Sequence, residues 1–146
     1  MQLVFDRLAS LGYRTNLVGR LLVREIDEQL APHGISAGHM PVFFALAEAQ
    51  AMTQRDLAVS AQVEQPTMAA TLARMERDGL IERHSNPNDG RSALVMLSAA
   101  GRAKLSDVHA AATAVNAKAA QHLSSEERAT LVSLLRRVAT TLGAET

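Results

Sequence analysis

The sequence predicts a mainly α-helical fold with one small β-hairpin. Over most of the chain, apolar residues recur at steps of three and four residues, which places them on one face of a helix. One region departs from this spacing, because the β-compatible runs 80–84 and 93–97 flank the turn-forming sequence Asn-Pro-Asn-Asp-Gly at 86–90. The length of 146 residues fits one domain, which we place at 1–146.

The first thirty residues are predicted to form one long helix. Pro32 and Gly34 are expected to end it near Leu30. A second helix is expected from about Ser36, a candidate N-cap, to about Gln50. The apolar stripe of the first helix consists of Val4, Leu8, Leu11, Thr15, Val18, Leu22 and Ile26.

Two shorter helices follow, and both have recognisable end signals. Thr53 is predicted to cap a helix over 54–60. A further helix is predicted over 65–78, with Pro66 in its first turn and Gly79 at its C′ position, where a left-handed backbone suits glycine. The predicted hairpin comes directly after this helix.

The C-terminal part is predicted to contain two helices. An alanine-rich helix is expected to run from about 98 to about 123. Ser124 and Glu127 have the spacing of a capping box, so the last helix is expected to run from there to about Leu142. The apolar stripes of the terminal helices lack partners within so small a central unit. We therefore expect 1–30 and 101–146 to form a helical dimerisation region.

The central elements, 36–100, have the order of a winged helix-turn-helix. A short helix, a second helix and a hairpin form a unit whose second helix enters the DNA major groove. The hairpin tip can then reach the DNA backbone or the minor groove. We name this segment the reader, and we expect a homodimer that presents two readers to a two-half-site operator.

Several tracts, in chain order, closely resemble the DNA-reading part of the MarR (multiple antibiotic resistance regulator) family. The resemblance implies a sequence-specific transcriptional regulator that binds double-stranded operator DNA, with repression as the family default. It covers nearly the whole chain in helix order and is densest from about Thr53 to Gly101. The tracts that carry it are 53–58 (TQRDLA), 64–68 (EQPTM), 72–83 (LARMERDGLIER), 86–91 (NPNDGR) and 97–101 (LSAAG).

The resemblance makes the helix over 65–78 the recognition helix. Gln65 and Thr67 can hydrogen-bond base edges or phosphates, and Arg74 can reach a phosphate or a guanine. Thr71 lies one turn after Thr67, so the two are expected to share a face. Pro66 begins the helix and leaves its N-terminus free to approach phosphate oxygens. The alternative is that Gln65 and Thr67 are ordinary helix-start residues.

The resemblance also assigns roles at the wing, which is the hairpin tip at 86–91, and at the helix over 54–60. Arg91 is expected to enter the minor groove, while Asp89 holds the wing or the arginine in place. Gln54 and Arg55 are expected to contact phosphates at a helix start. The alternatives are an exposed turn with a surface ion pair for Arg91 and ordinary solvated positions for Gln54 and Arg55.

Members of the family often bind a small aromatic or anionic effector between the reader and the dimer helices. By this resemblance, candidate wall residues here are Tyr13, Arg20, His39 and Phe43. A cation beside aromatic surface suits a ring that bears a carboxylate. The alternative is that the four side chains pack or pair locally.

The residue types exclude several kinds of site and leave one alternative sensor open. The absence of cysteine excludes disulfides, cysteine-based zinc fingers and a thiol-oxidation switch. We predict no metal site and no cofactor. A metal-responsive regulator of the same fold remains an alternative, with His33, His39 and His109 as ligands and help from Asp27 or Glu28.

Motifs and charge limit the remaining classes. The sequence has no H-E-x-x-H, G-x-S-x-G, G-x-G-x-x-G or P-loop motif, so we expect no enzyme. A helical interaction protein without DNA binding is the other alternative. The 15 Lys and Arg balance the 15 Asp and Glu, and 64–91 has four arginines against five carboxylates. We therefore expect DNA binding to depend on a few placed arginines, not on a broad basic field.

The ends and the uncharged stretches do not indicate a membrane partner. The N-terminus lacks a signal-peptide layout, with Asp6 and Arg7 close to the start. The longest run without Asp, Glu, Lys or Arg, 29–47, contains two prolines and two glycines. We expect a cytoplasmic protein.

Overall fold

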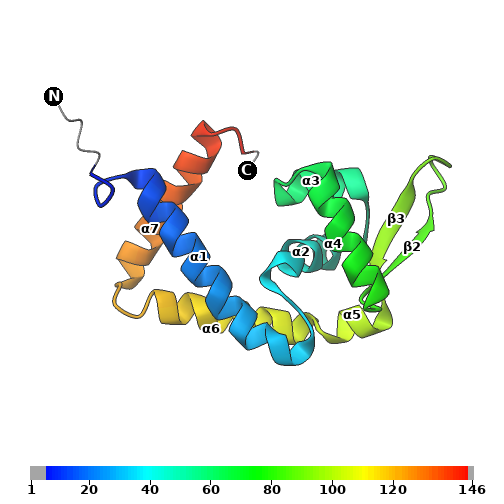
Figure 1. Cartoon of the computed structure of the whole chain (residues 1–146), viewed down its shortest axis with the longest axis horizontal. Helices are drawn as coiled ribbons and strands as arrows, with labels where there is room; N and C mark the ends of the chain where they lie inside the picture. The colour runs from blue at the N-terminus through cyan, green and yellow to red at the C-terminus, as the bar shows by residue number, and fades with distance from the viewer. Residues whose placement is uncertain (1–5, 145–146) are drawn as a thin grey trace.

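The computed structural model describes residues 6–144 and is mainly helical, as predicted (Figure 1). Three long helices, which we name the arm, lie on one side, and the reader lies on the other. The arm consists of α1 (Leu11–Leu30), α6 (Leu105–Ala119) and α7 (Ser125–Thr141). The remaining elements are η1 (Ala31–His33), η2 (Ala37–His39), α2 (Met40–Ala49), β1 (Ala51–Thr53), α3 (Gln54–Ala61), α4 (Gln65–Arg77), β2 (Ile81–Ser85), β3 (Ala93–Leu97) and α5 (Ala99–Ala103).

The end signals of the reader helices are confirmed. The Thr53 hydroxyl accepts a hydrogen bond from the backbone N–H of Asp56, and α3 begins directly after Thr53. Gly79 follows α4 with φ +74°, a left-handed conformation that glycine adopts without steric cost. The recognition helix is therefore bounded as the sequence predicts.

The predicted hairpin is confirmed as β2 and β3, and a third antiparallel strand, β1, which the sequence did not predict, pairs with β3. The strand order is β1-β3-β2, with Ile81 opposite Leu97 and Ala51 opposite Met96. A strand of three residues is too short to show an alternating pattern, and β1 is recognisable only from its pairing with β3. The additional strand places the N-cap of α3 beside the wing.

The N-terminal helix is shorter than predicted. It begins at Leu11, where the Ser10 hydroxyl accepts a hydrogen bond from the backbone N–H of Tyr13. Leu8 lies in a turn before the helix, and its backbone N–H donates a hydrogen bond to the Asp6 carboxylate. The Ser10 cap therefore fixes where the helix begins, although the apolar spacing continues upstream of that point. Val4, the first residue of the predicted stripe, lies outside the described residues.

The helix predicted over 98–123 is divided into α5 and α6 at Lys104, and α6 ends at Ala119. The backbone N–H of Lys104 bonds the Gly101 carbonyl, a three-residue step that interrupts the four-residue ladder. Gly101 also lies against the reader, since a Cβ added there would be 2.0 Å from the Leu80 carbonyl oxygen. The division lets α5 stay on the reader while α6 packs along α1.

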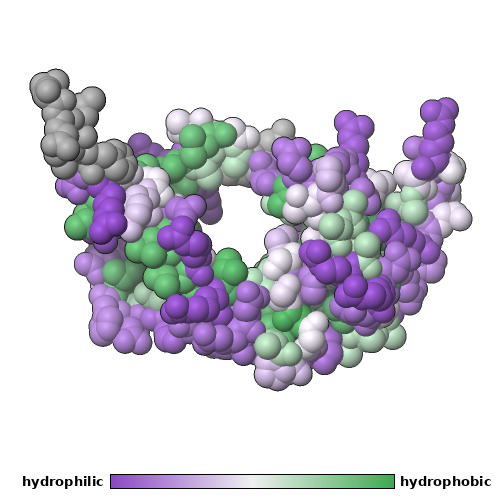
Figure 2. All heavy atoms as spheres, in the orientation of Figure 1, coloured by the Kyte–Doolittle hydropathy of each residue, from purple (hydrophilic) through white to green (hydrophobic). Residues whose placement is uncertain are grey.

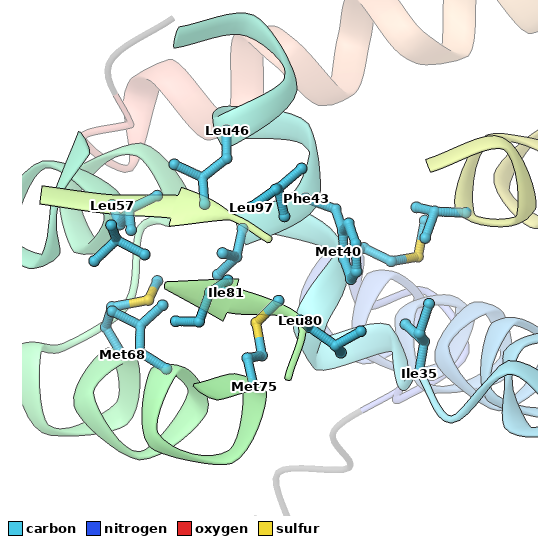
Figure 3. Packing of buried hydrophobic residues seen from close by; sticks show 14 of the residues in the cluster. Ile35, Met40, Phe43, Leu46, Leu57, Met68, Met75, Leu80, Ile81 and Leu97 are labelled. Carbon is cyan, nitrogen blue, oxygen red and sulfur yellow. The ribbon is translucent and has the colours of Figure 1, made fainter. Parts of the chain in front are cut away.

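The core lies where α2, α3 and α4 meet the strands (Figure 3). Phe43, Leu57 and Leu72 are at most 1% exposed. Val108 and Ala111 of α6 belong to the same cluster, so one core joins the reader to the arm. Apolar burial of this kind supplies the main driving force for folding.

The arm exposes an unusual amount of apolar surface. No residue of α7 is buried, although Leu131, Leu134 and Leu135 form an apolar stripe on it. Figure 2 shows hydrophobic residues over α1 and α7, around the opening between the arm and the reader. Within residues 6–144, no helix is both long and apolar enough to cross a membrane.

Candidate nucleic-acid interface

The recognition helix α4 has one buried and one exposed side. Met68, Leu72 and Met75 face the core and are at most 2% exposed. Gln65 and Thr67 lie on the exposed side near the N-terminus of the helix. In helix-turn-helix proteins, N-terminal residues of this helix contact base edges. The structure therefore leaves both predicted base-reading residues accessible.

Thr71 does not share this exposed side, which corrects the expectation that it would lie beside Thr67. Its side chain is 7% exposed, and its hydroxyl accepts a hydrogen bond from Arg74 at 3.4 Å. The positions of Met68, Thr71 and Met75 follow steps of three and four, so Thr71 belongs to the buried stripe. That spacing is visible in the sequence and was a usable signal.

The starts of α3 and α4 lie side by side. The Gln54 Nε2 donates to the Gln65 Oε1 at 3.4 Å across the helix-turn-helix. Arg55 and Pro66 are exposed beside them, at the first turns of α3 and α4. Backbone N–H groups at two helix N-termini form a suitable surface for phosphate oxygens.

The wing tip is organised by short side-chain contacts to the backbone. The Asp89 carboxylate accepts a hydrogen bond from the N–H of Arg91 at 3.0 Å, so it fixes the turn and leaves the guanidinium free. Asn86 holds the base of the turn, because it donates to the Ser92 hydroxyl and accepts from the N–H of Asn88. Sequence reasoning did not single out Asn86. Its signal was the tendency of asparagine to bond the backbone two residues on.

The arginines of the reader form two groups. Arg77 pairs with Asp78 at 3.2 Å, and Arg83 pairs with Glu76 at 2.9 Å. Within residues 6–144, no carboxylate lies within ion-pair distance of three others, Arg55, Arg74 and Arg91. The unpaired arginines are the ones that the sequence assigns to DNA.

A polar groove of about 480 Å³ runs between the start of α3 and the wing. It joins the two regions expected to touch DNA, and Arg55 lines it. Its other lining residues are Thr53, Gln54, Asp56, Arg83, Asn86, Asp89, Ser92 and Ala93.

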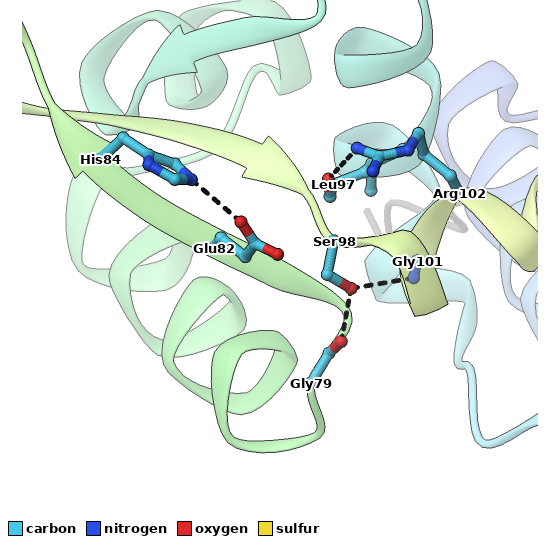
Figure 4. Close-up of polar contacts among 7 residues, drawn as sticks. All are labelled: Gly79, Glu82, His84, Leu97, Ser98, Gly101 and Arg102. Carbon is cyan, nitrogen blue, oxygen red and sulfur yellow. Dashed lines mark hydrogen bonds and ion pairs between the residues drawn. The ribbon is translucent and has the colours of Figure 1, made fainter.

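Hydrogen bonds of Ser98 connect the end of α4 to the start of α5 (Figure 4). The Ser98 hydroxyl donates to the Gly79 carbonyl at 2.5 Å and accepts from the N–H of Gly101 at 3.0 Å. The backbone N–H of Ser98 also donates to the Leu80 carbonyl. The recognition helix and α5 are thereby held as one body, because Ser98 is 8% exposed and its bonds are shielded from water.

The four predicted effector residues do not form one wall. Phe43 is fully buried in the core, and the Nδ1 of His39 accepts the backbone N–H of Ser36 in a capping box. Tyr13 lies under the Arg7 guanidinium near the start of α1, and Arg20 bonds Asn16 on the same helix. These contacts agree with the alternative of local packing and pairing.

Distance along α1 separates the two halves of this predicted wall. The segment that carries His39 meets α1 at Asp27, whose carboxylate accepts the N–H of Ala37 at 2.7 Å. Tyr13 lies fourteen residues earlier, roughly 21 Å along a helix. A single small ligand in one protomer does not span that length.

The histidines weighed as metal ligands each have another role. His33 pairs with Asp107 at 3.1 Å, His109 packs against the Phe44 ring, and His39 caps η2. Within the described part of the chain, no three His, Asp or Glu side chains are placed to hold a metal ion.

Comparison with known proteins connects this geometry to a family. The model of the MarR family matches residues 33–92. The multiple antibiotic resistance protein MarR of Escherichia coli is 29% identical over 92% of this chain and 94% of its own length.

Solved structures extend the likeness to three dimensions. A cysteine-to-serine mutant of E. coli MarR complexed with operator DNA has a TM-score of 0.85 and 29% identity, over 94% of this chain and 99% of that one. The apo form of the wild-type E. coli protein has a TM-score of 0.72, over 88% and 96%. In sequence, in fold and in the order of its reader elements, the chain is similar to the MarR family of transcriptional regulators.

Proposed function

We propose that the protein is a homodimeric, sequence-specific repressor that binds a two-half-site operator through α4 and the wing. The observation that carries this proposal is the division of the reader arginines. Arg77 and Arg83 lie within ion-pair distance of carboxylates, while Arg55, Arg74 and Arg91 have no such partner within residues 6–144. Unpaired arginines on an exposed surface are the groups that neutralise phosphates or read guanine.

The described conformation supports binding without a large rearrangement. Its TM-score to the operator-bound E. coli mutant is 0.85, against 0.72 to the apo wild type. The first three residues of α4, 65–67, and Arg91 of the wing are also exposed. A pair of such readers related by two-fold symmetry would occupy successive major grooves, about one helical turn apart.

The dimer is supported by the uncovered apolar side of the arm. Leu11, Leu134 and Leu142 line a groove between α1 and α7, and Leu142 is 82% exposed. A contiguous apolar patch of this kind indicates an interface. We assign the helical regions 1–30 and 101–146 to dimerisation, with a second copy of this chain as the occupant.

Release of the DNA by a small ligand is supported by the contacts between the reader and the arm. The reader contacts α1 through η2 and contacts α6 through α5. A small aromatic or anionic molecule that binds one arrangement of reader and arm more tightly shifts the population toward that arrangement. A thermal-shift screen of aromatic acids, followed by DNA-release titrations of the hits, tests this step.

DNA selection by the purified full-length protein tests the central proposal. We expect enrichment of a sequence with two related half-sites from a random pool, and binding that weakens as salt rises. Arg91→Ala should lower affinity for that sequence while the dimer stays folded. Unchanged affinity in a gel-shift titration would remove the wing from the interface. A reporter driven from the selected operator then distinguishes repression from activation.

A further inference from the structure

The amide side chains of Gln54 and Gln65 meet across the helix-turn-helix. Building on the proposed function, we propose that Gln54 is a positioning residue that determines which end of the Gln65 amide faces the DNA. Gln54 thereby sets the base preference at one position of each half-site. This role differs from the phosphate contact that the sequence analysis assigns to Gln54.

The two residues occupy equivalent places on neighbouring helices. Gln54 is the first residue of α3, held by the Thr53 cap and partly buried. Gln65 is the first residue of α4 and is exposed at the end of the recognition helix expected to enter the groove. Since Gln54 Nε2 donates to Gln65 Oε1 at 3.4 Å, the contact fixes a side chain that would otherwise rotate freely.

The contact matters for base recognition because the two ends of the Gln65 amide have opposite hydrogen-bonding roles. A glutamine presents an oxygen that accepts hydrogen bonds at one end and an NH₂ that donates them at the other. Because Gln54 engages the Gln65 oxygen, the Gln65 NH₂ is the end that stays available to a base. The NH₂ matches the major-groove acceptors of purines, adenine N7 or guanine N7 and O6, and does not match the N4 donor of cytosine.

Two substitutions at position 54 perturb the contact in different ways. Gln54→Ala removes the partner, so Gln65 rotates freely and loses its preference for one edge pattern. Gln54→Glu supplies only acceptors, so it attracts the Gln65 NH₂ and turns the oxygen to the groove. The first change should flatten one position of the recognised sequence, and the second should shift that position toward bases that offer a donor.

The experiment compares the sequences selected from one random DNA pool by wild type, Gln54→Ala, Gln54→Glu and a matched control. Ser60→Ala is the control, because Ser60 is exposed on the same helix α3. At the affected position we expect the wild-type base preference to fall about fivefold or more in Gln54→Ala, the scale of one side-chain–base contact. Ser60→Ala should select the wild-type sequence, and equal urea midpoints confirm folding of all variants.

A second set in the Gln65→Ala background identifies the route of the effect. If Gln54 acts through Gln65, changes at position 54 alter no base preference once Gln65 is gone. A uniform loss of affinity in Gln54→Ala with an unchanged recognised sequence would overturn the inference and mark Gln54 as a phosphate contact. Failure of the wild type to enrich any sequence would instead overturn the proposed function, and the inference with it.

Discussion

The unpaired arginines make the salt dependence of DNA binding a quantitative prediction. Each protomer has three, Arg55, Arg74 and Arg91, so the proposed dimer has six. If each neutralises one phosphate, the slope of log affinity against log salt is about −5.4. Removing Arg91 from both protomers leaves four, for which the slope is about −3.6. A fourfold rise in salt then weakens wild-type binding roughly 1,800-fold but the variant only about 150-fold.

Fluorescence anisotropy titrations of the selected operator over a roughly fourfold range of salt measure both slopes. Arg77→Ala is the matched control, because Arg77 is also exposed on the reader but is paired with Asp78. Its slope should remain that of the wild type. An equal reduction in Arg77→Ala and Arg91→Ala would refute the distinction between paired and unpaired arginines. A wild-type slope near about −10 would show that other cations face the DNA.

Three further predictions concern the framework of the site. Gly101→Ala should destabilise the fold by about 1–3 kcal/mol in urea unfolding, because its Cβ would meet the Leu80 carbonyl at 2.0 Å. Gly90→Ala, which meets nothing within 4 Å, is the control. Burial, and then the nearby Arg74 charge, lower the pKa of His39 below its usual 6.5. The neutral ring therefore stabilises the fold above about pH 6.5, and this contribution is lost as pH falls through the lowered pKa. His39→Gln should unfold with a shallower pH dependence in that range, and an unchanged profile would contradict this assignment. Leu134→Glu should dissociate the proposed dimer in sedimentation experiments, since it puts a charge into the apolar groove of the arm.

The local signals of the reader were readable from the sequence. The Thr53 cap, the Gly79 stop and the turn at 86–90 each depend on interactions within a few residues, so sequence neighbours determine them. The position of Arg91 beyond a tight turn is of the same kind. These features predicted the order of α3, α4 and the hairpin, and the family resemblance then assigned the candidate residues at the DNA.

Contacts between distant segments decided the rest. The strand β1 exists because it pairs with β3, more than forty residues later in the chain. The division at Lys104 accompanies the close approach of Gly101 to Leu80, which the sequence does not indicate. The predicted effector residues separated for the same reason, because Phe43 is required in the core.

The sequence by itself determined the ends of α3 and α4, the turn at 86–90 and the small number of arginines available to bind DNA in a protein of zero net charge. The tertiary structure decided which of those arginines are free. Arg77 and Arg83 are as basic as Arg91, but Asp78 and Glu76 lie within 3.2 Å of them in the folded chain. Formal charge adds along a sequence, whereas the field at a surface depends on distances between charges, and folding sets those distances.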